Sequence, residues 1–432
     1  MSTFQIIVLG IFSSLILIGI GVFAAFGGVL GTKGVGPVVI WGTLDRQTMQ
    51  GLLDTLEGQD KSFQSVSYVQ KSPATYEQDL INAMAAGTGP DLFLMPGEDT
   101  LSFSDKVLTI PYSIVSQGAY QSSFVDAGDV FLTSQGTLAL PFTIDPLVMY
   151  YNRDLFASAG VASPPSAWND LLTLAPKITA LDNRSAVQRS AVALGEWGNI
   201  PDAKAILAAL FMQVGDTIVA RNSGGAPVVT LSLGAQNQTD NPAESALRFY
   251  TEFANPTKTS YSWNRSLPSA SDAFAAGDVA MYFGFASEYG SLAQANPNLR
   301  FGVAPLPQIA GNSSQVTFGR VVGLAIARSA KNVQGALAIA QKLSAKSAVG
   351  LIAGALSLPP VRRDVAVDTS GSAAAAVFVQ SALISQSWLD PSPADSDSIF
   401  ETMIESVVSG ASTPATAIEE AGQSLSHLLP TQ

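Results

Sequence analysis

Apolar segments of strand length alternate with segments of helical periodicity along this chain, and this alternation most restricts its fold. In the first hundred residues, strands are predicted at 38–41, 66–69 and 91–95, and helices at 44–56 and 76–84. The second helix meets Gly87, a typical stop residue. Because strands alternating with helices of this length indicate βαβ units, we predict an α/β fold with a largely parallel sheet.

The same alternation continues through residues 147–285, which predict a second α/β unit. Its expected elements are a helix at 164–178, a loop or hairpin within 215–242, and a short helix from 269 that stops at Gly277 and leads into a strand. Strands return after residue 299, and the last hundred residues are mainly of helical pattern. One of these helices is expected to end at Gly410, and another to begin after Thr413.

Length and composition favour a folded protein of two domains. The 432 residues exceed what one ordinary core holds, and 47% of them are hydrophobic while 13% are charged. The net charge is −12, from 22 basic and 34 acidic residues, and no cluster of Lys or Arg occurs. Because phosphate contacts need concentrated positive charge, this composition argues against a nucleic-acid partner.

The chain has no cysteine and a single histidine, His427. Disulfides, Cys-based zinc sites, Cys nucleophiles and attachment as a lipoprotein are therefore excluded. A Ser-His-Asp triad would have to use His427, which lies near the C-terminal end and is expected to be a solvated tail residue. We predict neither a metal site nor a cofactor.

Residues 4–26 form an uncharged apolar stretch of 23 residues, about the length that a bilayer-spanning helix needs. The stretch lacks the basic start of a secretory signal peptide, and the small-residue cleavage sites around Ala24–Gly28 are weak. An uncleaved anchor is favoured over a cleaved signal. The glycine-rich residues 27–37 are expected to be a tether, so that residues 1–35 attach a folded part to the membrane.

Four segments carry a resemblance to a known family. They are AAGTGPDLFLM (85–95), LPFTIDPLVMYYNRDLFASAGVASPPSAWNDL (140–171), AFAAGDVAMYFG with LRFGVAPLPQ (273–308), and SWLDPSPADSDSIFETMIESVVSG (387–410). In this order, the chain resembles the family 1 extracellular solute-binding proteins of ABC importers, which are maltose-binding-protein-like and have the periplasmic-binding-protein type 2 fold. The four segments together indicate this family more specifically than any one of them does.

The resemblance implies two α/β lobes joined by hinge crossings. Lobe 1 is expected to contain residues 36–144 and 287–330, and lobe 2 residues 145–286 and 331–432. Such a protein is not an enzyme: it captures a solute, here a mono- or oligosaccharide, in the cleft between the lobes by hinge closure and delivers it to a permease. The soluble part would then be extracytoplasmic, with the N-terminal helix as a single-pass anchor in the cell membrane.

Sugar recognition combines aromatic rings with planar polar groups on loops at the ends of strands. Candidate ligand-binding residues of this kind are Trp41, Thr43, Asp45, Glu98, Asp145, Glu196, Trp197, Trp263, Asn264, Phe283, Phe285, Glu288, Arg320 and Trp388. Structural alternatives stay open for several of them. At least one of Phe283 and Phe285 is expected in the core, and Arg320 could form a buried pair; Trp168, inside a helix pattern, is expected to be core.

Asp145 interrupts an apolar run, and the resemblance places it at a lobe crossing where a family member contacts sugar. Its alternatives are to cap a backbone amide or to pair with Arg153. Glu196 and Trp197 also match a sugar-contacting Glu and aromatic residue, whereas Trp41, Thr43 and Asp45 match the first ligand loop loosely. Residues 394–398, ADSDS, lack an aromatic that the family can have, which favours a smaller or more polar ligand.

Two other functions remain open from the sequence. One is a sensory or adhesion module that keeps the fold without a transporter. The other is a cleft glycoside hydrolase, which would need two carboxylates at a defined spacing. No pair in the sequence is marked for this role.

Overall fold

The computed structural model describes residues 35–231, 241–312 and 314–429, and the chain divides into two compact units. Of the described residues, unit 1 contains those up to Leu94 together with Ala325–Ala345, and unit 2 contains those from Met95 to Leu324 and from Lys346 onward. The chain therefore passes from one unit to the other three times.

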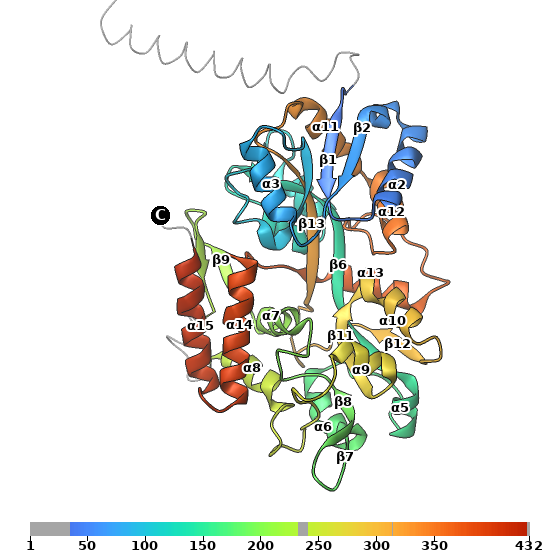
Figure 1. Cartoon of the computed structure of the whole chain (residues 1–432), viewed down its shortest axis with the longest axis vertical. Coiled ribbons are helices and arrows are strands. Elements are labelled where there is room, and N and C mark those ends of the chain that lie inside the picture. Colours follow the sequence, from blue (N-terminus) through green and yellow to red (C-terminus); the bar gives the residue numbers. More distant parts are fainter. Residues whose placement is uncertain (1–34, 232–240, 313, 430–432) are drawn as a thin grey trace, which may run out of the picture. The chain divides into compact units, whose positions relative to one another are not determined.

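Unit 1 is built on parallel strands, as the sequence predicted. Its elements are β1 (Val38–Gly42), α2 (Arg46–Gln59), the 3-10 helix η2 (Lys61–Ser65), β2 (Val66–Gln70), α3 (Tyr76–Ala85), β3 (Leu92–Pro96) and α11 (Val333–Leu343). Strand β1 lies between β2 and β3 and pairs with both in parallel; β1 and β2 are seen side by side in Figure 1. Val38, Ile40 and Leu92 are fully buried, so the strands carry the core of this unit.

A buried carboxylate joins separate strands and a helix of unit 1 through hydrogen bonds. Asp91, just before β3, has 7% of its surface exposed. One of its carboxylate oxygens accepts a hydrogen bond from Val39 N (3.0 Å), and the other accepts from Lys331 N and Asn332 N (both 2.9 Å), at the start of α11. Backbone N–H groups satisfy a buried acid in this way without a cation, and the three bonds tie β1 and α11 to β3.

Unit 2 is organised around β6, a strand of 14 residues that contains Asp145. Its strands are β4 (Ile110–Pro111), β5 (Gly136–Thr137), β6 (Ala139–Asn152), β7 (Ala180–Leu181), β8 (Val187–Val192), β9 (Val219–Arg221), β10 (Pro227–Val229), β11 (Val279–Phe285), β12 (Phe301–Ala304), β13 (Thr317–Ile326) and β14 (Ser385–Gln386). Strands β11 and β12 pair antiparallel with β6, whereas β8 pairs parallel with β11. The prediction of a largely parallel sheet is therefore wrong around β6.

The helices of unit 2 follow the predicted pattern. They are α4 (Gln117–Ser123), α5 (Arg153–Ser158), α6 (Trp168–Ile178), α7 (Ala203–Gln213), α8 (Pro242–Glu252), α9 (Ala270–Ala276), α10 (Tyr289–Ala295), α12 (Lys346–Leu356), α13 (Ala373–Leu383), α14 (Pro393–Val408) and α15 (Pro414–Leu428), with the 3-10 helices η3 (Gly97–Asp99), η4 (Asp126–Phe131) and η6 (Ala286–Glu288). Helices α14 and α15 lie side by side (Figure 1). Thr413 caps α15 through a bond from Thr416 N, as predicted.

Helix α7 lies inside unit 2, because all of its residues except Lys204 are buried. Its last residue, Gln213, accepts a bond from the indole N–H of Trp168 (2.7 Å) and donates to the carbonyls of Pro307 and Val316. Trp168 is 3% exposed, which confirms that it belongs to the core.

The predicted membrane anchor at 4–26 lies outside the residues that the structure describes. Within the described ranges, no single helix has the length and apolar composition to cross a membrane; α11 and α12 pass that test only together, as a bent pair.

The compact units and the predicted lobes have different bounds. The units divide after residues 94, 324 and 345, whereas the predicted lobe boundaries follow residues 144, 286 and 330. Residues 95–144 belong to unit 2, and β6 continues through the predicted boundary at residue 144 as one unbroken strand. The predicted lobe boundaries describe where the chain bends when the lobes move, and they stay a prediction.

We expect Asp91→Ala to lower the free energy of unfolding by about 3 kcal/mol, because three backbone N–H groups lose their acceptor inside the protein. Urea unfolding followed by circular dichroism measures this. The control is Asp54→Ala, since the exposed Asp54 accepts only from the Gln50 side chain. Equal, small losses in both variants would show that the Asp91 carboxylate does not fasten unit 1.

Candidate functional site

Unit 2 contains a cavity of about 420 Å³ with a wall of aromatic and charged side chains. Its ring-bearing and charged lining residues are Glu98 in η3, Trp197 after β8, Asp202 and Lys204 at the start of α7, Phe318 and Arg320 on β13, and Trp388, Asp390 and Asp397 around the start of α14. Several of these follow the ends of strands, where ligands bind in α/β proteins. Within the described residues, no group of three or more His, Asp or Glu side chains is placed to hold a metal ion.

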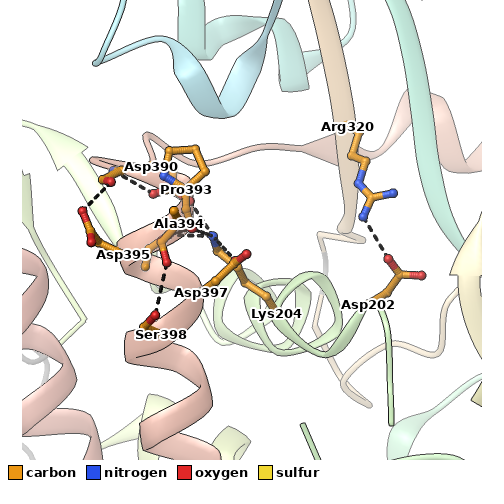
Figure 2. Close-up of polar contacts among 11 residues, drawn as sticks. Asp202, Lys204, Arg320, Asp390, Pro393, Ala394, Asp395, Asp397 and Ser398 are labelled. Carbon is orange, nitrogen blue, oxygen red and sulfur yellow. Dashed lines mark hydrogen bonds and ion pairs between the residues drawn. The ribbon is translucent and has the colours of Figure 1, made fainter. Parts of the chain in front are cut away.

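Lys204 is held by four acceptors at the start of α14. Its Nζ lies 2.7 Å from Asp390 Oδ2 and 2.8 Å from Asp397 Oδ1, and it also contacts Ser396 Oγ and the carbonyl of Pro393 (Figure 2). The ammonium group has three N–H donors, so these contacts use its full capacity.

Asp390 is the buried partner in this cluster, with 2% of its surface exposed. Ser396 Oγ and Ser392 N donate to its two carboxylate oxygens. Burial raises the pKa of Asp390, while the charge of Lys204 acts in the opposite direction. The carboxylate therefore depends on Lys204 for its charge compensation.

A second ion pair lies across the cavity, where Arg320 Nη2 is 2.9 Å from Asp202 Oδ1 (Figure 2). The guanidinium group also lies over the ring of Phe285, with 3.6 Å from Cζ to the ring centroid. Asp202 is buried while about half of the Arg320 side chain is exposed. Burial raises the pKa of Asp202 to about 7; Arg320 opposes this shift and the neighbouring Glu288 adds to it.

The loop that carries Trp197 is shaped by Gly195 and held by Asn199. Gly195 has φ +104°, and a Cβ there would lie 2.7 Å from Ala254 N, so the turn after β8 requires glycine. Asn199 Nδ2 donates to the carbonyls of Asn264 (2.9 Å) and Leu267 (3.0 Å), and its Oδ1 accepts from the Trp263 indole N–H (2.9 Å). Through these bonds, Asn199 holds the loop against the protein interior.

Two side chains of the cavity wall have no partner of their own. Among the residues that the structure describes, the half-buried Trp197 has no ring or cation contact and its indole N–H has no acceptor; the Glu98 carboxyl likewise has no hydrogen bond or ion pair. Glu98 is exposed, yet the surrounding protein raises its pKa by desolvation, with Lys204 and Arg320 acting against this. The ring and the carboxyl are therefore available to a ligand.

Four of the predicted ligand-binding residues line this cavity: Glu98, Trp197, Arg320 and Trp388. Trp388 is 5% exposed and stacks on Phe400, with ring centroids 5.9 Å apart. Lys204 lies over its ring at 5.6 Å, so Trp388 is mainly a structural part of the wall.

Other predicted residues have interior roles that do not need a ligand. Trp263, Phe283 and Phe285 are at most 1% exposed, and Phe283 packs on Trp168. Asn264 carries the carbonyl that Asn199 holds. Glu196, 3% exposed, pairs with Arg265 at 3.4 Å and does not line the cavity.

Asp145 and Glu288 do not line the cavity. Asp145 is half-buried, and its Oδ1 accepts a bond from Ser287 N at 3.0 Å, which is the capping alternative. Burial raises its pKa, opposed by the bonds from Ser287 and by the charge of Arg320. Glu288 accepts from the Tyr282 hydroxyl and from Phe285 N, both at 2.6 Å. A ligand role for either residue stays a prediction.

The first predicted loop, with Trp41, Thr43 and Asp45, belongs to unit 1. Asp45 caps α2 by accepting from Thr48 N at 2.8 Å, and this bond lowers its pKa. Lys71 Nζ lies 3.7 Å above the Trp41 ring, and Thr43 is half-buried. One face of the Trp41 ring is therefore occupied, and the ligand roles of this loop stay predictions.

Sequence reasoning missed four charged residues of the cavity: Asp202, Lys204, Asp390 and Asp397. Asp202 stands directly before an apolar helix, and Asp390 opens the run DPSPADSDS, which has the composition of a helix start. Both patterns indicate helix N-termini. Neither shows that the two helices begin beside each other.

A second hollow, of about 510 Å³ and more open, is lined by η4 and the β9–β10 hairpin. Of the predicted residues it includes only Trp388. Its charged groups have internal partners: Asp126 pairs with Arg363, and Arg221 donates to the Gly225 carbonyl. The smaller cavity is the better candidate because it carries the unpartnered ring and carboxyl.

Comparison with protein families finds that residues 54–379 match the model described as bacterial extracellular solute-binding protein. A binding protein of Brucella abortus (strain 2308) is 31% identical over 108 residues, which are 24% of this chain and 26% of that protein. The galactooligosaccharide-binding protein of Bacillus subtilis (strain 168) is 27% identical over 135 residues, 31% of each chain. The matched segments thus span about a quarter to a third of these curated relatives.

Among solved structures, the chain is similar to the cyclic alpha-maltosyl-1,6-maltose binding protein from Arthrobacter globiformis, with a TM-score of 0.74 and 16% identity. The similarity covers 91% of this chain and 99% of that one. The two-lobed α/β solute-binding fold that the sequence predicted is confirmed by this likeness.

We expect Lys204→Ala to lower the free energy of unfolding by about 3 kcal/mol, because Asp390 would remain buried without its cation. Urea unfolding at pH 7 measures the change. The matched control is Lys61→Ala, since Lys61 is well exposed and pairs only with Glu57 on the surface. A loss for Lys204→Ala no larger than for Lys61→Ala would contradict the assigned role of Lys204.

The raised pKa of Asp202 predicts a specific pH dependence. The folded protein binds this proton more tightly than the unfolded chain, so the contribution of Asp202 to the free energy of unfolding falls as pH rises from about 4 to about 7. We expect Asp202→Asn to remove up to about 1.4 kcal/mol per pH unit from this slope. Urea unfolding across that range tests it, with the exposed Asp272→Asn as control; an unchanged slope in Asp202→Asn would refute the prediction.

Proposed function

The chain belongs to the bacterial extracellular solute-binding proteins, and we propose that it captures a carbohydrate, a mono- or oligosaccharide, for an ABC importer. The observation that carries the proposal is the cavity of unit 2, which is lined by a ring and a carboxyl, Trp197 and Glu98, that have no partner among the described residues. The other charged groups of the wall are bonded to one another.

This wall suits the two kinds of surface that a sugar presents. The ring of Trp197 offers an apolar face for the C–H side of a pyranose, while Glu98 accepts hydrogen bonds from hydroxyl groups. The exposed part of Arg320 adds N–H donors, and Phe285 and Asp202 fix its orientation. The ion pairs of Lys204 and Arg320 keep the charged side chains of the wall in place before a ligand arrives.

The names of similar proteins support a carbohydrate. The Bacillus subtilis relative is named for galactooligosaccharide and the Arthrobacter globiformis structure for a cyclic maltosyl-maltose. We further propose that the lobes close around the solute by hinge motion and that no bond in it is broken. Delivery to a permease, an extracytoplasmic soluble part and anchoring through residues 4–26 complete the proposal.

A thermal-shift screen of the full chain against mono- and oligosaccharides tests the function, since a ligand that binds the folded state raises the melting temperature by mass action. We expect a sugar to stabilise the protein, and Trp197→Ala to weaken its affinity about tenfold or more through the lost ring contact. Calorimetric titration measures the affinity.

Tyr289→Ala serves as the control, because Tyr289 is an exposed aromatic residue, 40% accessible, that does not line the cavity. Its affinity for the sugar should equal that of the unchanged protein. Stabilisation by amino acids with no response to any sugar would overturn the carbohydrate proposal. If a sugar binds Trp197→Ala and Tyr289→Ala with equal affinity, the binding site does not include Trp197.

A further inference from the structure

The wall of the cavity has an excess of negative charge. Its titratable lining residues are the carboxyl groups of Glu98, Asp202, Asp390 and Asp397 and the cations Lys204 and Arg320, so that three carboxylates still face two cations when Asp202 keeps its proton. The whole chain has a net charge of −12, so its wider field has the same sign. An anionic ligand would therefore need a cation that is free to receive it.

Lys204 is not free in this sense. Asp390, Asp397, Ser396 and Pro393 supply four acceptors for its three N–H donors. A ligand anion would have to displace Asp390, which is almost fully buried and would be left without a cation. The cost of that exchange excludes Lys204 as an anion receptor.

Arg320 is compensated as well, although half of its side chain is exposed. Asp202 binds its Nη2, and the Phe285 ring covers one face of the guanidinium. Asp145 and Glu288 add negative charge to this region, because the charge of Arg320 acts on Asp145 and that of Glu288 acts on Asp202. The remaining N–H groups of Arg320 therefore suit neutral hydroxyls better than anions.

Glu98, in contrast to the two cations, lacks a partner of opposite charge. Its carboxyl is partly desolvated by the surrounding protein and has no hydrogen bond or ion pair among the described residues. A ligand cation beside it would replace the missing compensation. Trp197 lines the same cavity, and an indole face attracts cations as well as the C–H groups of a sugar.

We propose that this cavity selects sugars by charge, binding an amino sugar more tightly than the neutral parent sugar and a sugar acid least, with Glu98 as the residue that sets the preference. The inference rests on the proposed carbohydrate function and adds the substrate class. The ammonium group of the ligand pairs with the Glu98 carboxylate while the pyranose face lies on Trp197. No covalent step is involved.

The test is calorimetric titration of the full chain at pH 7 and low salt with two matched series: glucose, glucosamine and glucuronate, and galactose, galactosamine and galacturonate. In the series that binds, we expect the amino sugar to bind about three- to fivefold more tightly than the neutral sugar, as a partly exposed ion pair contributes. We expect the sugar acid to bind about tenfold more weakly than the neutral sugar.

Glu98→Gln should remove the preference for the amino sugar over the neutral sugar, because glutamine still accepts a hydrogen bond but carries no charge. The matched control is Asp395→Asn, which removes one negative charge from the first turn of α14 at a side chain that bonds Ser392 and does not line the cavity. This control should keep the full preference.

The outcomes separate the two proposals. A sugar acid that binds as tightly as the neutral sugar, or a preference for the amino sugar that survives Glu98→Gln, overturns charge selection while the carbohydrate function stands. Loss of the preference in Asp395→Asn would assign it to the general field and overturn the role of Glu98. No response to any of these sugars or to the oligosaccharides of the screen would overturn the carbohydrate function itself.

Discussion

The contact of Lys204 with Asp390 and Asp397 is the interaction on which the candidate site depends. It joins the first turn of α7, the internal helix of unit 2, to the first turn of α14, which is almost two hundred residues away in the sequence. Both partners are needed, because Asp390 is too deeply buried to remain charged without a cation. The wall of the cavity is thus built from the same bonds that hold two helices together.

Most side chains of the cavity wall are bonded within the protein, and they differ from the two for which we propose a role in ligand recognition. The ion pairs of Lys204 and Arg320, the stacking of Trp388 on Phe400 and the bonds of Asn199 all end within the protein. The side chains of Trp197 and Glu98 take no part in these bonds among the described residues. Under the proposed function, a ligand meets a wall whose charged groups are already fixed, and such a wall loses little conformational freedom on binding.

Much of the fold could be predicted from local pattern. The βαβ order of unit 1, the core role of Trp168 and the caps at Gly277 and Thr413 each depend on residues close in sequence. The site was predicted less completely. An aromatic residue in a predicted loop, such as Trp197, can be recognised from the sequence. The pairing of Lys204 with Asp390 cannot, because it depends on which helices have their N-terminal ends close together in the folded protein. The antiparallel partners of β6 were missed because strand direction depends on chain topology rather than composition.

The loop at Gly195 has a consequence for how such proteins diversify. Its shape comes from a left-handed glycine and from Asn199, and neither contact involves the Trp197 side chain. The identity of residue 197 is therefore uncoupled from the folding of the loop that presents it. Under the proposed function, a substitution at position 197 would alter which solute is bound while the scaffold stays intact, so evolution and protein engineers could vary specificity at this position first.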